Sequence, residues 1–311
     1  MSDNPAAPAS PFADLIAGIR GWLGKQIDQL LPYPLMTRQI PPASMTDEQL
    51  HEAIYRVGAE LVDNISVHVL MPTYANNEIN PDPRFPRGMP TTVRDHTLTM
   101  FTSAHDSFGL SVIGLGKHAT AAALGPISNI AETLTLTRWL LEHPSEADRQ
   151  GRAFRLMAES AVLMERNLHA MAQQDQVTIA STPPSASQRA AQFLSGSDGY
   201  FLYALTSAGG VHPAAQRAVL FYGNPSTRIM DFDFKGMHVV RAFWITRSIE
   251  LHLELCRIVV PVLGWQRWEP ALDKLARKLR PLAEETQRRF AQPHLQAWKL
   301  RVASGRAPDI V

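Results

Sequence analysis

The chain contains one cysteine, Cys256, so no intrachain disulfide can stabilise its fold. Cys256 lies in an apolar stretch between Leu255 and Ile258, where a cysteine usually packs as a small hydrophobic side chain. A reactive thiol requires a basic and partly exposed setting, and the neighbouring Arg257 would lie about 100° away around a helix. We therefore predict that Cys256 is buried and structural.

Neither sign of charge is in excess, because 30 Lys and Arg residues stand against 29 Asp and Glu residues, for a formal net charge of +1. A broad nucleic-acid surface normally brings a clear basic excess, so a nucleic-acid partner is not predicted. The chain also lacks an apolar run of about 18 residues, and Met1–Asn4 have neither the basic nor the apolar region of a signal peptide. We expect a soluble, cytoplasmic protein.

The motifs of several helical enzymes are missing as well. The sequence has no Glu-x-x-His pair for a di-iron centre, and neither a His-Glu-x-x-His motif nor a cysteine pair for zinc. The sequence Gly114-x-Gly116 lacks the third glycine and the preceding strand of a dinucleotide-binding loop. The sequence therefore assigns no cofactor.

What the sequence does contain is apolar residues at the spacing of α-helices. Residues 126–172 read as two long helices separated only by His143-Pro144-Ser145, which favours an antiparallel helical hairpin. Residues 237–263 form the longest apolar run, and its apolar residues cover most of a helix circumference, as in a central helix. We predict an all-α bundle of about nine to ten helices built around a long central helical hairpin.

The order of segments along the chain follows from the same patterns. We expect a disordered tail at 1–11, an amphipathic helix at 12–31, a proline-rich linker at 32–43, a helical domain at 44–303 and a frayed C-terminus at 304–311. Thr46-x-x-Gln49 is a capping box that opens a helix ending near His68. The five prolines between Pro72 and Pro90 argue against a helix there. Further helices are expected at 92–107, 187–194, 198–207 and from Glu269 onward.

One candidate metal site is the doublet His105-Asp106. Phosphohydrolases of the HD superfamily hold a divalent metal with a His, a His-Asp pair and a later Asp, and such ligands generate a metal-bound hydroxide. His68 or His96 would supply the first ligand and Asp148 the last. The alternative is that His105 and Asp106 only end a helix.

One candidate catalytic pair is Arg247 with His252, since HEPN-type ribonucleases carry Arg-x4–6-His on helices. Two other pairs have the same spacing, Arg138 with His143 and Arg289 with His294, so the pattern is close to what chance provides among 11 histidines. The pair at 247 and 252 lies in the longest apolar helix, where polar residues must find partners. Arg247 and Glu250 are one helical turn apart, so we predict an ion pair between them.

The order of parts between Ile113 and Gly264 resembles an uncharacterised class of all-helical proteins common in actinobacteria. The resemblance rests on three blocks: Glu132 followed by Trp139-Leu140-Leu141; Pro144-Ser145-Glu146 followed by Arg149, Arg152 and Arg155; and Tyr203, Leu205, Ser207 and His212. It implies a helical fold and a soluble location, and carries no activity. If the class has a polar, ligand-binding centre, it would consist of Glu132, Arg155, Tyr203 and His212.

The leading hypothesis is a cytoplasmic helical binding or interaction protein, with a protein partner or a second copy of the chain as its ligand. Loose analogy with helical bacterial proteins suggests a stress or phage-defence role. A phosphoester-cleaving enzyme of HD or HEPN type is the second hypothesis. The third is a peripheral membrane protein that lies on the lipid surface through residues 12–31.

Overall fold

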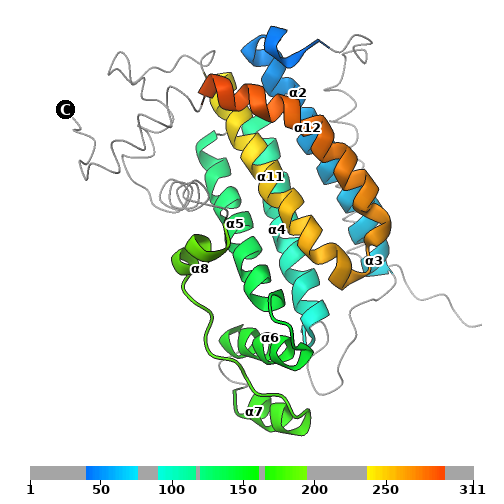
Figure 1. Ribbon diagram of the computed structural model, residues 1–311, viewed down its shortest axis with the longest axis vertical. Helices are drawn as coiled ribbons and strands as arrows, with labels where there is room; N and C mark the ends of the chain where they lie inside the picture. Colours follow the sequence, from blue (N-terminus) through cyan, green and yellow to red (C-terminus); the bar gives the residue numbers. More distant parts are fainter. Residues whose placement is uncertain (1–39, 76–89, 117–119, 161–164, 195–236, 291–311) are drawn as a thin grey trace, which may run out of the picture. The chain divides into compact units, whose positions relative to one another are not determined.

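The computed structural model describes residues 40–75, 90–116, 120–160, 165–194 and 237–290 (Figure 1). Every regular element in these ranges is a helix, and they contain no strand, which confirms an all-α protein. The chain divides between Ser44 and Met45 into two units. The described part of the first is short and contains the 3₁₀ turn Pro42–Ser44. The expected amphipathic helix at 12–31, and the expected helix at 198–207, lie outside the described residues.

Five long helices form the core of the second unit: α2 (Asp47–Ile65), α4 (Val93–Gly116), α5 (Thr120–Leu141), α11 (Met237–Leu263) and α12 (Glu269–Phe290). Helix α11 packs against each of the other four, and Figure 1 shows it between α5 and α12. Fully buried side chains such as Phe243, Ile245 and Ile249 fill its contacts. A helix that is apolar around its circumference must be covered on all sides, and the prediction that α11 is central is confirmed. Cys256 lies on it, buried as expected.

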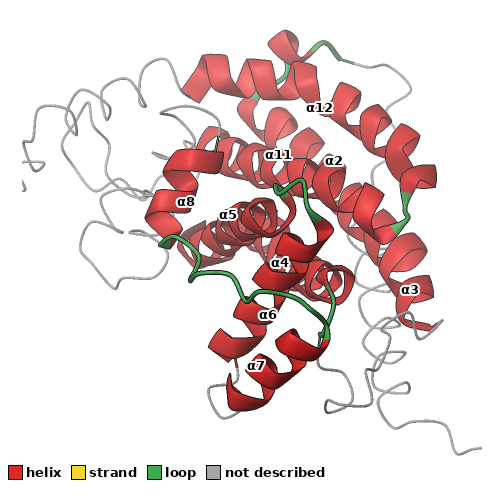
Figure 2. Ribbon diagram, turned by 60° about the horizontal axis from the view of Figure 1, so that its bottom comes forward, coloured by secondary structure: helices red, strands yellow, loops and turns green. Residues whose placement is uncertain are grey.

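The predicted break at His143-Pro144-Ser145 is confirmed, since α5 ends at Leu141 and α6 (Glu146–Ser160) begins after it. The structure does not confirm that these two helices form the central hairpin. Helix α5 packs along α4 and α11 instead, while α6 lies at one end of α4 and α5 (Figures 1 and 2).

The apolar face of α6 is covered from another side. Phe154 and Met157 pack against Leu168 and Met171 of α7 (Glu165–Gln174). The loop at 177–180 also runs against α6, where a Cβ on Gly151 would come within 2.1 Å of the Thr178 carbonyl oxygen. Only glycine permits that approach of two backbones. The apolar residues of α6 are therefore divided between two contacts: one with α7 and this loop, and one in which Ala153 and Leu156 pack on the end of α5.

The helix that starts at the capping box is longer than predicted. Thr46 and Gln49 make both expected hydrogen bonds, but beyond Ile65 the chain continues through the π-helical turn η2 (Ser66–Leu70) into α3 (Met71–Ala75). The expectation that no helix includes Pro72 is wrong, because Pro72 lies in α3, directly after the π-helical turn. The helices predicted near residue 187 and from Glu269 are confirmed by α8 (Ala186–Phe193) and α12. The helix predicted at 92–107 is α4, but it continues to Gly116, so His105 and Asp106 do not end a helix.

Within the described ranges, none of the helices combines the length and apolar character needed to cross a bilayer.

Candidate functional site

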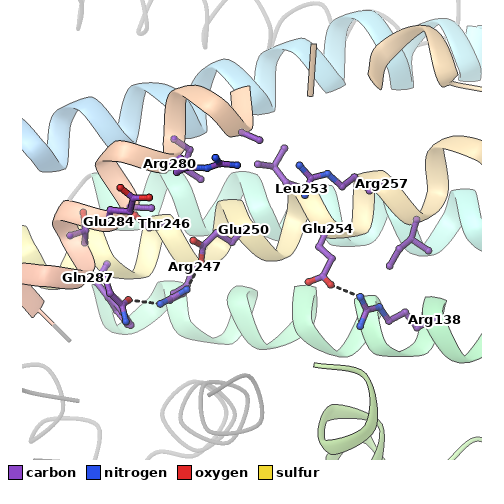
Figure 3. Close-up of a pocket in the computed structure, with 16 residues that line it drawn as sticks. Arg138, Thr246, Arg247, Glu250, Leu253, Glu254, Arg257, Arg280, Glu284 and Gln287 are labelled. Atoms are coloured by element: carbon purple, nitrogen blue, oxygen red, sulfur yellow. Dashed lines mark hydrogen bonds and ion pairs between the residues drawn. The ribbon is translucent and has the colours of Figure 1, made fainter. Parts of the chain in front are cut away.

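A groove of about 660 Å³ lies between α11 and α12, with Arg138 of α5 on one side (Figure 3). We call it the α11–α12 groove. Its floor is made by buried side chains of both helices: Phe243, Thr246, Leu253, Leu279 and Thr286. The arrangement arises because α12 packs its leucines on α11 and turns its polar side outward, as its strongly one-sided pattern predicts.

The rim of the groove carries charge of both signs. Its four arginines are Arg138, Arg247, Arg257 and Arg280. Its three glutamates are Glu250, Glu254 and Glu284. An apolar floor below a charged rim is typical of a ligand site, where burial supplies affinity and the polar groups supply orientation.

Arg138 ties three helices together at the side of the groove. Its Nη2 donates to Oε1 of Glu254 on α11, and its Nη1 donates to the carbonyl of Phe193, the last residue of α8. Its side chain is only 21% exposed. The guanidinium group is therefore held in place by the protein itself.

Arg247 is held in the same way at the opposite end of the groove. Its Nη1 lies 2.5 Å from Oε2 of Glu250, which confirms the predicted ion pair. Its Nη2 donates to Oε1 of Gln287 on α12, and its guanidinium carbon lies 5.3 Å from the centre of the Phe243 ring. These contacts fasten α11 to α12.

Arg257 and Arg280 are held much more loosely. A carboxylate oxygen of Asp273 lies 3.8 Å from Nη2 of Arg257, and the side chains of Arg257 and Asp273 are each more than half exposed. Among the described residues, Arg280 has no ion pair or hydrogen bond. Figure 3 shows the two side chains extending from opposite helices toward Leu253. Of the four arginines on the rim, these two are the ones that have no close ion pair among the described residues.

The candidate catalytic pair is split between two environments. Arg247 faces the groove, whereas His252 is fully buried on the core side of α11. Five residues along a helix amount to about 140° of rotation, which explains the separation. The structure therefore does not bring Arg247 and His252 together.

His252 contacts a residue from the other candidate site instead. Its Nε2 lies 3.1 Å from Nδ1 of His105 on α4, and Nε2 of His105 lies 2.8 Å from Oγ of Ser66 in η2. The His252 ring stacks on Phe108, with ring centres 4.4 Å apart. This buried histidine pair joins η2, α4 and α11 through a chain of polar contacts.

The direction of these hydrogen bonds depends on which ring nitrogens carry the protons. Nδ1 of His252 meets no hydrogen-bond partner among the described residues.

Burial governs the charge of both rings. It lowers the pKa of His105 from 6.5 to about 4, and it holds the pKa of His252 well below 6.5, with the neighbouring His105 acting in the same direction. Both rings are therefore neutral near neutral pH.

The other proposed metal ligands are dispersed. Asp106 is exposed on α4, although it follows His105 in sequence. Asp148 is on α6 and contacts Nδ1 of His143 at 3.2 Å. Within the described ranges, no three His, Cys, Asp or Glu side chains converge in a way that could hold a metal ion.

The ligand-binding centre implied by the family resemblance is only partly visible. Glu132 is half-buried on α5, and Nε of Arg155 on α6 donates to the Ala180 carbonyl at 2.7 Å. Arg155 thus holds the 177–180 loop. Tyr203 and His212 lie outside the described residues.

The groove was not predicted from the sequence. A usable signal existed on α11, where Arg247, Glu250, Glu254 and Arg257 recur at helical spacing along an otherwise apolar helix. Such a stripe marks one polar face, but it does not say which helix lies opposite. The partners from α12 become evident only when the two helices are packed together.

No protein-family model, no curated protein and no solved structure matches this chain. The geometry of the residues therefore has to carry the argument about function.

Proposed function

We propose that the protein is a cytoplasmic helical binding protein whose ligand occupies the α11–α12 groove. The single observation that carries the proposal is the pairing of a buried apolar floor with a charged rim in one concave site. A concave site of a few hundred cubic ångströms with placed polar groups is characteristic of small-ligand sites.

The environment of the histidines supports binding over acid–base catalysis. A general acid or base must reach the substrate, directly or through one water. His105 is 3% exposed and His252 is 0% exposed, and both lie against phenylalanine rings. Above its floor, the groove offers only arginines, glutamates and one amide as polar side chains.

The held arginines support a preformed site. Arg138 and Arg247 already pair with glutamates of α11, and they also reach α8 and α12 respectively. A site whose rim is fixed before the ligand arrives loses less conformational entropy on binding. The groove is therefore suited to recognition without a large rearrangement.

The test uses Nile red, a neutral dye that fluoresces in apolar surroundings. We expect saturable binding to the full chain, and at least tenfold weaker binding in Ala283→Trp and Gln287→Trp, which place an indole in the groove from α12. Ala271→Trp is the matched control, because Ala271 is exposed on the same helix and does not line the groove.

The two groove variants guard against a folding artefact, since Gln287 is exposed whereas Ala283 is half-buried. Circular dichroism at 222 nm checks that each variant remains helical. Equal Nile red affinity in the wild type and in both groove variants, or an equal loss in Ala271→Trp, would overturn the proposal.

A further inference from the structure

We infer that the ligand of the α11–α12 groove is a small amphipathic anion, an apolar body with one carboxylate, and that Arg257 and Arg280 hold the carboxylate. The inference rests on the proposed function of the groove and adds the chemical class of its ligand.

The charges of the groove are distributed unevenly along its length. At one end, Glu250 is paired with Arg247, and Glu284 has no ion pair among the described residues. At the other end, Arg257 has a carboxylate oxygen of Asp273 at 3.8 Å, and the Arg280 side chain has no ion pair among the described residues. An anion is therefore attracted to one end of the groove and repelled from the other.

Arg257 and Arg280 approach the same place from opposite helices (Figure 3). Two guanidinium groups that converge repel each other, and an exposed pair such as Arg257 with Asp273 contributes little to hold them. A carboxylate between them would relieve the repulsion and accept two or more charge-assisted hydrogen bonds. Arginine suits this role because its planar group binds carboxylates in a bidentate manner.

The apolar requirement comes from what lies beside the two arginines. Leu253 and Leu279 are already buried, so the apolar surface open to a ligand comes from the half-buried Ile258, Ala276 and Ala283. A ligand that placed only an anion here would leave this surface in contact with water. An alkyl or aryl body attached to the carboxylate would cover these three side chains and gain free energy from apolar burial.

The opposite end limits the ligand to one negative charge. Glu284 and Glu250 lie on the rim there, so a second carboxylate at the far end of the ligand would meet like charge. The same glutamates set the orientation, with the charged head at Arg257 and Arg280 and the apolar body along the floor. A volume of about 660 Å³ accommodates a molecule of this kind.

Decanoate is the probe for the anionic amphiphile, and its affinity is measured by isothermal titration calorimetry with the full chain. We expect Arg257→Gln and Arg280→Gln each to weaken decanoate binding about tenfold, the loss of one charge-assisted contact. Nile red, which is neutral, should bind both variants as it binds the wild type. Arg277→Gln is the matched control, because Arg277 is an exposed arginine of α12 that does not line the groove.

Two further ligands separate the head from the body of the probe. Decanol, which has the same chain without the charge, should bind at least tenfold more weakly than decanoate and equally to all variants. Acetate, which has the charge without the chain, should fail to displace decanoate at equal concentration. Both results are expected only if the carboxylate and the apolar body are recognised together.

The inference is overturned if both arginine variants bind decanoate as tightly as the wild type, or if Arg277→Gln loses as much affinity. Decanol binding as tightly as decanoate, or acetate displacing it, would also overturn it. These failures leave the proposed function standing as long as Nile red binding responds to the groove-filling tryptophans. If Nile red binding does not respond, the groove is not the site, and both proposals fail.

Discussion

The His252 ring lies between phenylalanines in the centre of the bundle, and its Nδ1 has no hydrogen-bond partner among the described residues. A neutral imidazole with one unpaired ring nitrogen is tolerable there, because it costs less than a buried charge. Adding a proton would place an unpaired donor or a net charge among apolar rings. The buried histidine pair should therefore make the fold sensitive to acid.

The pKa values of these histidines fix the direction of that sensitivity. Burial lowers the pKa of His105 and of His96 from 6.5 to about 4, and that of His252 well below 6.5. Between these values the unfolded chain binds more protons than the folded one. Above about pH 6.5 these histidines do not reduce the free energy of unfolding. As the pH falls toward about 4, the free energy of unfolding decreases, by roughly 3 kcal/mol for His105 alone.

We predict that His252→Phe flattens this dependence, since it removes one neutral buried imidazole and leaves an apolar ring in its place. The free energy of unfolding, measured by urea titration from about pH 7 to about pH 5, should fall less steeply in the variant than in the wild type. His169→Gln is the control, because His169 is exposed on α7, and it should keep the wild-type slope. An unchanged slope in His252→Phe would contradict the prediction.

Single residues were predictable where their environment is local. The burial of Cys256 and the Arg247–Glu250 ion pair follow from neighbours within one helical turn, and the structure confirms both. The contact between His105 and His252 joins positions 147 residues apart. No helical period encodes such a contact, so two residues assigned to separate hypotheses turned out to touch each other.

At the scale of elements, the start of α4 shows how a helix end is specified. Oδ2 of Asp95 accepts hydrogen bonds from the backbone N–H groups of Thr91 and Thr92, while the Asp95 N–H donates to Oγ1 of Thr92. Asp95 is only 2% exposed. These bonds satisfy donors that the first turn of a helix leaves without a partner.

We predict that Asp95→Ala destabilises the protein by about 2 kcal/mol, the cost of a lost cap together with buried donors left without an acceptor. Urea unfolding followed by circular dichroism would measure the change. Asp106→Ala is a suitable comparison, because Asp106 is exposed on the same helix, and its effect should stay within about 0.5 kcal/mol. Equal effects of the two substitutions would show that the cap contributes nothing.

Helix starts were predicted better than helix partners, for a physical reason. Capping at Thr46 and at Thr92 depends on side chains three residues away, so the sequence specifies it directly. The position of α6 depends on Gly151, which admits the 177–180 backbone, and on the apolar side chains of α7. Those contacts are tertiary, and the stripe that suggested a central hairpin does not distinguish among possible partners.

At the scale of the molecule, apolar packing is divided among separate clusters. The largest joins α2, α4, α5, α11 and α12, and a small one joins Phe154 and Met157 of α6 to α7 and the loop that follows it. A third cluster joins Ala153 and Leu156 of α6 to the ends of α5 and α8. The groove belongs to the large cluster, through Leu253 and Leu279. A cluster with few apolar members is expected to open at a lower free energy than the body it is attached to.

The candidate site itself could not be predicted, because it exists only at this scale. Arg257 and Arg280 lie on different helices and meet only because α12 folds back along α11. The sequence identified α11 as central and α12 as one-sided, which are the two conditions for the groove. It did not identify the register between them, which places the arginines together.

The division into clusters predicts two kinds of unfolding, which hydrogen exchange read by mass spectrometry can separate. Phe154→Ala removes a ring that is 1% exposed from the α6–α7 cluster, so amides of α6 and α7 should exchange faster while those of α4 and α11 keep their protection. Ile249→Ala removes a fully buried side chain from the large cluster, and a loss of about 3 kcal/mol should lower protection in every core helix. Because α11 packs on four other helices, a cavity beside it weakens contacts that all of them share. If Phe154→Ala accelerated exchange in α11 as much as in α7, the two clusters would unfold as one unit, and the groove would depend on the whole chain rather than on the α2–α4–α5–α11–α12 core.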